Sequence, residues 1–333
     1  MSRDEHTQTP SCSRSKRMDK VLSVLASPVT LPPLLVYGLV VGSSTAVLPR
    51  RARRKIRCAA FRGLSMGPWG PAFDRLTWQP WTEEPRCIYA SLNAPRDALG
   101  EVLLPIAALR DKPVPAGAVR VVIVSDTHGK HHLLTDSLPD GDLLIHCGDL
   151  LSRNASIGIN SGRADGRSLA AVRDLNAWLG TLPHAHKVVV AGNHDGVLES
   201  VGTERARELL SEAIYLEDEV REVGGLRVGG SPWSHPGGSA NRAFQSEGGP
   251  RLLQSPSRAR AEKLDLLVMH CHHDGAAAAL RPRVFASGHL HGAHGVSRTP
   301  WGLEICASIC DGLYRAVQSP VVVDIPASVV RNG

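Results

Sequence analysis

Short apolar runs that end in polar residues recur through the last two-thirds of the chain. At 188–190 three valines follow one another without alternation, which is typical of a strand covered on both faces. Similar runs at 119–124, 142–146, 265–269 and 284–287 predict four more buried strands. We therefore expect a sheet-rich domain beginning near residue 118.

Other patterns place helices and closing strands between and after these runs. Residues 168–179 have apolar side chains at helical spacing, which predicts an amphipathic helix capped by Ser168 and ended by Gly180. A second helix is expected at 203–211. Further strands are expected at 213–216, in a hairpin of 220–223 and 226–228 that turns at Gly224 and Gly225, and at 305–307 and 321–325. The Gly/Ser/Pro-rich stretch 229–250 predicts a loop.

The amino-terminal third has a different character. Residues 1–20 are polar and basic, which predicts a disordered tail. Residues 21–49 carry no charge, and a basic cluster follows at 50–57, an arrangement typical of a membrane anchor. However, a helix that starts at Pro33 has only the 16 residues to Leu48, about 24 Å against a hydrocarbon core of roughly 30 Å.

We favour membrane attachment for 21–57 and keep a targeting peptide and a non-inserting apolar segment as alternatives. In each case we expect this segment to govern location and not chemistry. Prolines punctuate 58–117, which we predict to be a linker that packs partly against the following domain. That domain is expected to span 118–326, with 327–333 as a tail.

The net charge of +6 does not indicate a nucleic-acid partner. Residues 1–57 contain 11 Lys and Arg against 3 Asp and Glu, which leaves 27 against 29 for the rest of the chain. The main domain is therefore slightly acidic, and no specific nucleic-acid binding is expected. The seven cysteines are odd in number and lack paired CxxC spacing, so we expect free thiols in a reducing compartment, the cytoplasm.

Polar residues with metal-binding side chains follow the five buried strands. The set is Asp126, His128, Asp149, Asn193, His194, His270, His289 and His291. If the strands share a sheet, their carboxyl ends bring these side chains to one edge. Carboxylate, imidazole and amide donors suit manganese, iron or zinc. The number of donors suits two ions sharing a carboxylate, which can clamp a phosphoryl group and lower the pKa of a bridging water.

These blocks, DTH, GD, GNHD, a lone His after a strand, and GHLH, resemble those of the calcineurin-like metallophosphoesterase superfamily. The likeness is greatest to its metallophosphoesterase-domain-containing phosphodiesterase group and extends to WLGTLPHAHKVVVAGNHD, LRVGGSPW and PVVVDIP. It covers about 118–326. The resemblance implies an α/β fold, a four-layer sandwich of two mixed β-sheets flanked by helices.

The resemblance also implies roles for the individual residues. Asp126, His128 and His291 would hold one divalent metal ion, and Asn193, His270 and His289 a second, with Asp149 bridging them. Mn²⁺ is favoured, with Fe and Zn as alternatives. His194 would face the substrate phosphate, and Asp195 would orient an imidazole.

Two stretches depart from the group's pattern. After the lone His, the short run CHHDGAAAAL replaces a longer segment, so His272 and His273 are either alternative ligands or, as we favour, solvated. The loop after SPW is rich in glycine, so the choice of substrate cannot be transferred.

We therefore expect a metal-dependent phosphoric ester hydrolase that cleaves a phosphodiester, with cyclic nucleotides among the candidate small substrates, by attack of a metal-bridging hydroxide. The alternatives are a phosphomonoesterase or protein-phosphatase-like activity and a non-catalytic, metal-bound scaffold at a membrane. A protein phosphatase is disfavoured because Leu150 and Leu151 follow Asp149 where that family has Asp and Arg-Gly. The sequence indicates no oligomeric state.

Overall fold

The computed structural model describes residues 84–93, 101–151, 165–234, 243–247, 250–254 and 263–327. The predicted tail at 1–20, the apolar segment at 21–57 and the predicted tail at 327–333, apart from Ala327, lie outside these residues. Within the described ranges, no helix has both the length and the apolar character needed to cross a membrane.

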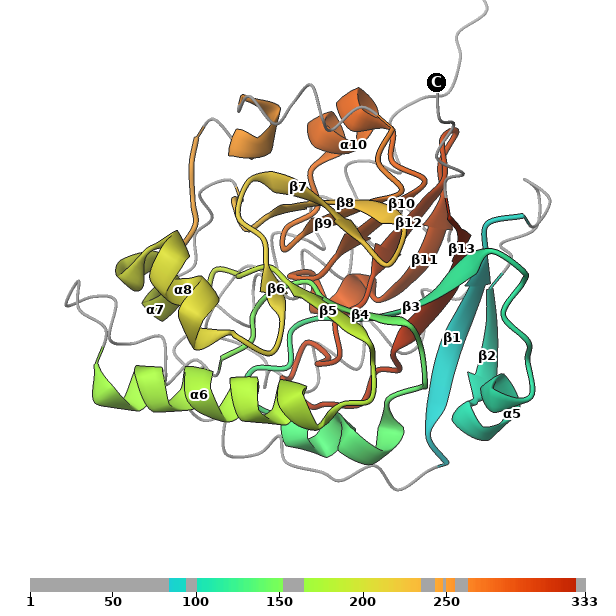
Figure 1. Ribbon diagram of the computed structural model, residues 1–333, viewed down its shortest axis with the longest axis horizontal. Coiled ribbons are helices and arrows are strands. Elements are labelled where there is room, and N and C mark those ends of the chain that lie inside the picture. The colour runs from blue at the N-terminus through green and yellow to red at the C-terminus, as the bar shows by residue number, and fades with distance from the viewer. Residues whose placement is uncertain are drawn as a thin grey trace, which may run out of the picture. The chain divides into compact units, whose positions relative to one another are not determined.

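The described residues form two β-sheets (Figure 1). The strands of the first sheet are β1 (Arg86–Ser91), β2 (Glu101–Pro105), β3 (Ala118–Val124), β4 (Leu143–His146), β5 (His186–Val189), β6 (Ile214–Tyr215) and β13 (Val321–Pro326). Their order in space is β2-β1-β13-β3-β4-β5-β6. The strands β3 to β6 run parallel, whereas β13 lies antiparallel to β3.

The second sheet is also mixed. Its strands are β7 (Glu219–Val223), β8 (Leu226–Ser231), β9 (Leu266–Met269), β10 (Val284–Ser287), β11 (Gly295–Arg298) and β12 (Leu303–Cys306). In the order β11-β12-β10-β9-β8-β7, the four inner strands are parallel and the two edge strands are antiparallel to their neighbours. The five strands predicted from the apolar runs are all present.

Alternate side chains along the buried strands pack into different layers. In β3, Val121 and Ile123 face the core between the two sheets, whereas Val122 and Val124 pack in the core that includes residues of α6 (Gly166–Thr181). In β9, Leu267 and Met269 pack with residues of α10 (Asp274–Leu280) on the outer side of the second sheet. Figure 1 shows α6 beside the first sheet and α10 beside the second. The predicted four-layer α/β sandwich is confirmed.

The remaining helical elements connect strands of these sheets. They are α5 (Ile106–Arg110), η2 (His131–Ser137), α7 (Gly196–Val201), α8 (Thr203–Leu209), η4 (Arg251–Leu253) and η5 (His291–Ala293). The sequence analysis missed α7, α10 and β11. Each has fewer than eight residues, which is too short for a periodic pattern to stand out from chance.

The cap predicted for the long helix was wrong. Asp165, and not Ser168, is the N-cap of α6: its backbone is extended, and its carboxylate accepts a hydrogen bond from the backbone N–H of Ser168 at 2.7 Å. Ser168 is already within the first helical turn. Gly180 does not end the helix, which continues to Thr181.

The proline-rich segment 58–117 is more than a linker, because part of it belongs to the first sheet. Strand β1 pairs in parallel with β13, and β2 completes the edge as an antiparallel neighbour of β1. Cys87 and Ala90 of β1 are fully buried. The prolines hid these strands from sequence reasoning, but Pro105 ends an edge strand, where a missing N–H removes no ladder hydrogen bond.

A buried ion pair joins the added strand to the centre of this sheet. Arg120 of β3 contacts Asp324 of β13 through two hydrogen bonds, Nε to Oδ1 at 2.9 Å and Nη2 to Oδ2 at 3.0 Å. The Tyr89 hydroxyl of β1 donates to the same carboxylate at 2.9 Å. Arg120 and Asp324 are each only 6% exposed. Removing one partner therefore leaves an uncompensated buried charge.

We predict that Asp324→Asn lowers the free energy of unfolding by about 3 kcal/mol or more, the usual cost of breaking a buried pair. Urea denaturation measures this change. The matched control is Asp140→Asn, which breaks an exposed contact with Arg110 whose Nε to Oδ2 distance is 3.4 Å. That change should cost less than about 1 kcal/mol. Equal losses in the two variants would contradict the importance assigned to the buried pair.

Candidate metal centre

The sequence analysis supposed that the strands leading into the predicted ligands share one sheet, but the structure divides them between two. Strands β3, β4 and β5 belong to the first sheet, and β9 and β10 to the second. The two sets of carboxyl ends nevertheless meet, because the backbone N–H of His289, after β10, donates to the Asp126 carboxylate, after β3, at 2.9 Å. The site therefore lies where the two sheets come together.

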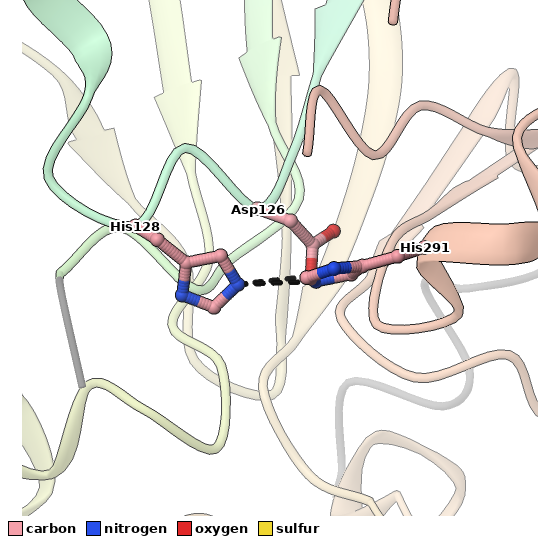
Figure 2. A group of neighbouring side chains, drawn as sticks. All are labelled: Asp126, His128 and His291. Atoms are coloured by element: carbon pink, nitrogen blue, oxygen red, sulfur yellow. Dashed lines mark hydrogen bonds and ion pairs between the residues drawn. The ribbon is translucent and has the colours of Figure 1, made fainter. Parts of the chain in front are cut away.

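One group of side chains comprises Asp126, His128 and His291. The Nε2 atoms of His128 and His291 are 3.1 Å apart, and Nε2 of His291 is 3.1 Å from Oδ1 of Asp126. Figure 2 shows the His128 ring pointing toward Asp126 and His291, which lie side by side. All three residues are buried.

A second group comprises Asn193, His270 and His289. The side-chain oxygen of Asn193 is 3.0 Å from Nε2 of His270 and 2.9 Å from Nδ1 of His289. The two imidazole rings stand edge to face, with centroids 5.1 Å apart. Two ring nitrogens and an amide oxygen thus converge from three loops.

Asp149 lies between the two groups. Its Oδ1 is 3.3 Å from Nε2 of His270, and its Oδ2 is 3.7 Å from Nε2 of His128. The Nε2 of His194 is 3.9 Å from the same Oδ2. The carboxylate therefore presents one oxygen to each side.

The spacing of the donor atoms fits divalent transition metals. With metal–nitrogen and metal–oxygen bonds of about 2.1 Å, neighbouring ligands of one ion are separated by about 3.0 Å in an octahedron and about 3.4 Å in a tetrahedron. The hydrogen-bond contacts within the two groups and the Asp149–His270 contact measure 2.9 to 3.3 Å, and Nε2 of His128 lies 3.9 Å from Oδ1 of Asp126. Imidazole, carboxylate and amide oxygen are also suitable donors chemically. The residues present therefore fit two bound cations.

The buried carboxylates of the site favour positive charge on the groups around them. Burial by itself lowers the pKa of His270, but the Asp149 carboxylate outweighs burial and raises this pKa to about 9. Burial likewise raises the pKa of Asp149, yet the charges of His270 and His194 hold it well below its usual range. Burial lowers the pKa of His289 to about 4, which keeps this imidazole in the neutral form that binds metals.

Backbone carbonyls orient two of the imidazoles. Nδ1 of His270 is 2.9 Å from the carbonyl oxygen of Cys147, and Nδ1 of His291 is 2.8 Å from that of Asp311. Each ring can therefore donate through Nδ1, which turns Nε2 toward the donor groups as the nitrogen that a cation would bind in place of a proton. Such outer hydrogen bonds fix the tautomer of a metal ligand.

The loops hold an unusual amount of backbone strain. Asp126, His128, Asp149 and His289 have positive φ angles of 54°, 47°, 52° and 61°, a conformation that non-glycine residues rarely adopt. Such strain costs of order 1–3 kcal/mol per residue and concentrates at functional sites. Glycine is required beside two of these residues, because a Cβ atom at Gly192 would overlap Asp149 and one at Gly288 would overlap Asp126.

Asp195 was expected to orient an imidazole, but the structure gives its carboxylate a different role. Its carboxylate accepts hydrogen bonds from the backbone N–H groups of Gly192 (2.7 Å), Leu150 (3.1 Å) and Leu151 (3.0 Å). It thus ties the loop carrying Asn193 to the loop carrying Asp149. Burial and the nearby charge of Asp149 raise the pKa of Asp195 to about 7.

His194 is buried beside Asp149 and His128. Its backbone N–H donates to Oδ1 of Asp149 at 2.9 Å, and its ring stands edge to face with that of His128, with centroids 4.7 Å apart. Burial lowers its pKa. The ring is close enough to Asp149 and His128 to share an ion with them, so geometry by itself leaves open both ligation and contact with substrate.

His272 and His273 lie outside the donor groups just described. The side chain of His272 is largely buried, with Nε2 3.3 Å from Glu304, and the centroid of its ring lies 5.1 Å from that of Phe285. His273 caps α10 by accepting the backbone N–H of Ala276 at 3.0 Å. Both therefore have structural partners, and neither is merely solvated.

Sequence reasoning missed the loop 310–318, which supports the first group. Gln318 donates to the backbone oxygens of His291 and Cys310, and Asp311 supplies the carbonyl that orients His291. Tyr314, with a φ of 59°, places its ring edge to face with His128 and His291 at centroid distances of 4.7 and 5.0 Å. An Asp-Gly turn directly after the buried run 305–310 was the available signal.

Comparison with known proteins identifies the family of this chain. The family model for calcineurin-like phosphoesterases matches residues 119–293, which include all the residues of the two donor groups and Asp149. The chain belongs to the calcineurin-like phosphoesterase family. This family uses divalent metal ions, and the Asp/His groups could hold them.

Curated relatives share much of the chain. A UPF0046 protein of Caenorhabditis elegans is 35% identical over 266 residues, which cover 68% of this chain and 88% of the relative. Human metallophosphoesterase domain-containing protein 1 is 29% identical over 258 residues, covering 65% of this chain and 74% of the relative. A solved archaeal phosphodiesterase structure covers 58% of this chain and 84% of its own at 16% identity, but its TM-score of 0.31 is too low to inform the site.

We predict that Asp195→Asn weakens metal binding by about ten- to hundredfold, the range for outer-shell changes. An amide cannot accept all three N–H groups, so the loops that present Asp149 and Asn193 lose a common support. The concentration of Mn²⁺ that gives half-maximal activity measures the effect. Asp165→Asn, which keeps a good N-cap on the remote α6, is the control. An unchanged Mn²⁺ requirement in the Asp195 variant would refute this role.

Proposed function

We propose that this calcineurin-like phosphoesterase hydrolyses a phosphodiester at a dinuclear metal site. Asp126, His128 and His291 would hold one divalent cation, and Asn193, His270 and His289 the other, with Mn²⁺ favoured over Fe or Zn. When bound, the two cations would polarise the phosphoryl oxygens and lower the pKa of water between them.

The position of Asp149 carries this proposal. One carboxylate oxygen faces His270 of the second group, while the other faces His128 of the first. A single carboxylate within reach of both groups would hold two cations close enough to act on one phosphate, since paired ions of this kind lie about 3.5–4 Å apart. The carboxylate would also offset part of their mutual repulsion.

His194 would act on the substrate. It projects from the same turn as Asn193, and its backbone N–H is fixed by Asp149, so its ring is held beside the place of the cations. The Asp149 carboxylate opposes the lowering of its pKa by burial. A protonated ring there would stabilise the charge of the phosphoryl group or donate a proton to the leaving oxygen.

Two buried leucines favour a diester over a monoester. Leu150 and Leu151 occupy the positions after the GD block and are each 1% exposed, so neither offers a positive charge to the substrate. A phosphodiester carries one negative charge, whereas a phosphomonoester carries nearly two at neutral pH. Small aryl diesters, aryl monoesters and cyclic nucleotides, assayed side by side, test this preference. Faster cleavage of the monoester would support the alternative activity.

We predict that Asp149→Asn nearly abolishes hydrolysis, because the neutral amide weakens the hold on both cations at once. Chelation of the wild-type protein should likewise remove activity, and Mn²⁺ should restore it. Metal content measured beside the rate separates loss of ions from loss of chemistry. Full activity in metal-free protein would overturn the dinuclear proposal.

We predict that His194→Ala keeps two cations per chain but lowers the turnover by about 10²- to 10⁴-fold, the range for a positioned proton donor. His186→Ala, at the exposed start of β5, is the control. Elemental analysis gives the metal content of each variant. Loss of one cation in the His194 variant would make this residue a ligand.

A further inference from the structure

A second convergence of metal-type donors lies outside the proposed catalytic site. His131 and His132 are the first residues of η2, and Asp174 lies on α6. Nε2 of His131 is 3.1 Å from Oδ2 of Asp174, and Nε2 of His132 is 3.0 Å from the same oxygen. The three donor atoms lie within 4.8 Å of one another. The proposed hydrolysis uses none of these residues.

The direction of the two rings is unusual for adjacent residues. Neighbouring positions of a helix point to different sides, so their side chains do not ordinarily face one partner. Here the ring centroids are only 4.3 Å apart, and both rings turn one nitrogen to a single carboxylate oxygen. These nitrogen–oxygen distances of 3.1 and 3.0 Å match the separation of about 3.0 Å expected for neighbouring ligands of one ion.

The surroundings hold these donors in place. His131 is 2% exposed, and its ring packs on Trp178, one turn after Asp174 on α6, with centroids 5.2 Å apart. The Trp178 Nε1–H donates to the Thr135 hydroxyl at 3.1 Å, and that hydroxyl donates to the carbonyl of His132 at 3.0 Å. The side chains of His132 and Asp174 are 58% and 56% exposed. A cation would therefore find one rigid ligand, two accessible ligands and room for water.

We propose that His131, His132 and Asp174 form a separate binding site for a divalent transition metal, with Zn²⁺ the best match to two imidazoles and a carboxylate. The ion would join η2 to α6. Because η2 begins three residues after His128, the same ion would also restrain the loop that carries Asp126 and His128. This site does not depend on the proposed hydrolysis.

Protonation does not oppose this assignment. Burial and the adjacent His132 lower the pKa of His131 to about 4, so its ring is neutral at pH 7 and binding needs no proton release from it. A pair of plain histidine–carboxylate hydrogen bonds is the competing explanation for the geometry. Only metal binding distinguishes the two.

Equilibrium dialysis of the full chain against Zn²⁺ tests the proposal. Wild-type protein should bind one Zn²⁺ per chain more than Asp174→Asn or His132→Gln, whatever the number of ions at the catalytic site. Both substitutions are on exposed side chains, so the fold should tolerate them. Asp136→Asn, an exposed carboxylate on the same element η2, is the matched control and should bind as many ions as the wild type.

Thermal unfolding gives a second test, because Zn²⁺ would not raise the melting temperature through these residues if they formed only hydrogen bonds. At about a hundredfold excess of Zn²⁺ over its dissociation constant, the melting temperature of the wild type should rise by about 5 °C more than that of Asp174→Asn. Mn²⁺-dependent hydrolysis should persist in both cluster variants, so failure here and failure of the proposed function are distinguishable. Equal Zn²⁺ content in the wild type and both variants would overturn the proposal, as would an equal loss in Asp136→Asn.

Discussion

The face-to-face packing of two sheets is the constraint on which the rest of this structure depends. Apolar side chains from alternate positions of β3, β4, β8, β9 and β10 fill the space between the sheets. This packing brings the carboxyl ends of strands from both sheets to one place. Neither sheet by itself carries a full set of donors, since Asp126 and Asp149 come from one and His270 and His289 from the other.

Burying these charged and polar groups together is energetically unfavourable, and several features of the fold compensate for it. Three carboxylates and several imidazoles are buried around the proposed cations, and four of the residues have strained backbones. Backbone N–H and carbonyl groups meet much of their hydrogen-bonding demand, as at Asp195, His270 and His291. Strain in the loops is tolerated because rigid strands hold both ends. The proposed ions would supply the positive charge that the buried carboxylates favour.

The same elements link the two proposed metal sites. The loop after β3 presents Asp126 and His128 and runs directly into η2, where His131 and His132 meet α6. A metal ion bound at η2 would therefore also restrain the loop that carries Asp126 and His128. The ring of Tyr314 and the hydrogen bonds of Gln318 constrain the other side of the first donor group.

Local patterns in the sequence determined the buried strands, the long helix, the set of polar residues at the strand ends and the family. The sequence also indicated no disulfide framework, and no disulfide joins the five cysteines in the described ranges. These features depend on residues close together in the chain. Only the tertiary structure decided that the strands divide between two sheets, that residues 86–91 and 101–105 extend the first sheet, and that Asp195 supports loops instead of an imidazole. It also decided that His131, His132 and Asp174 converge, because a contact between residues some forty positions apart leaves no local pattern.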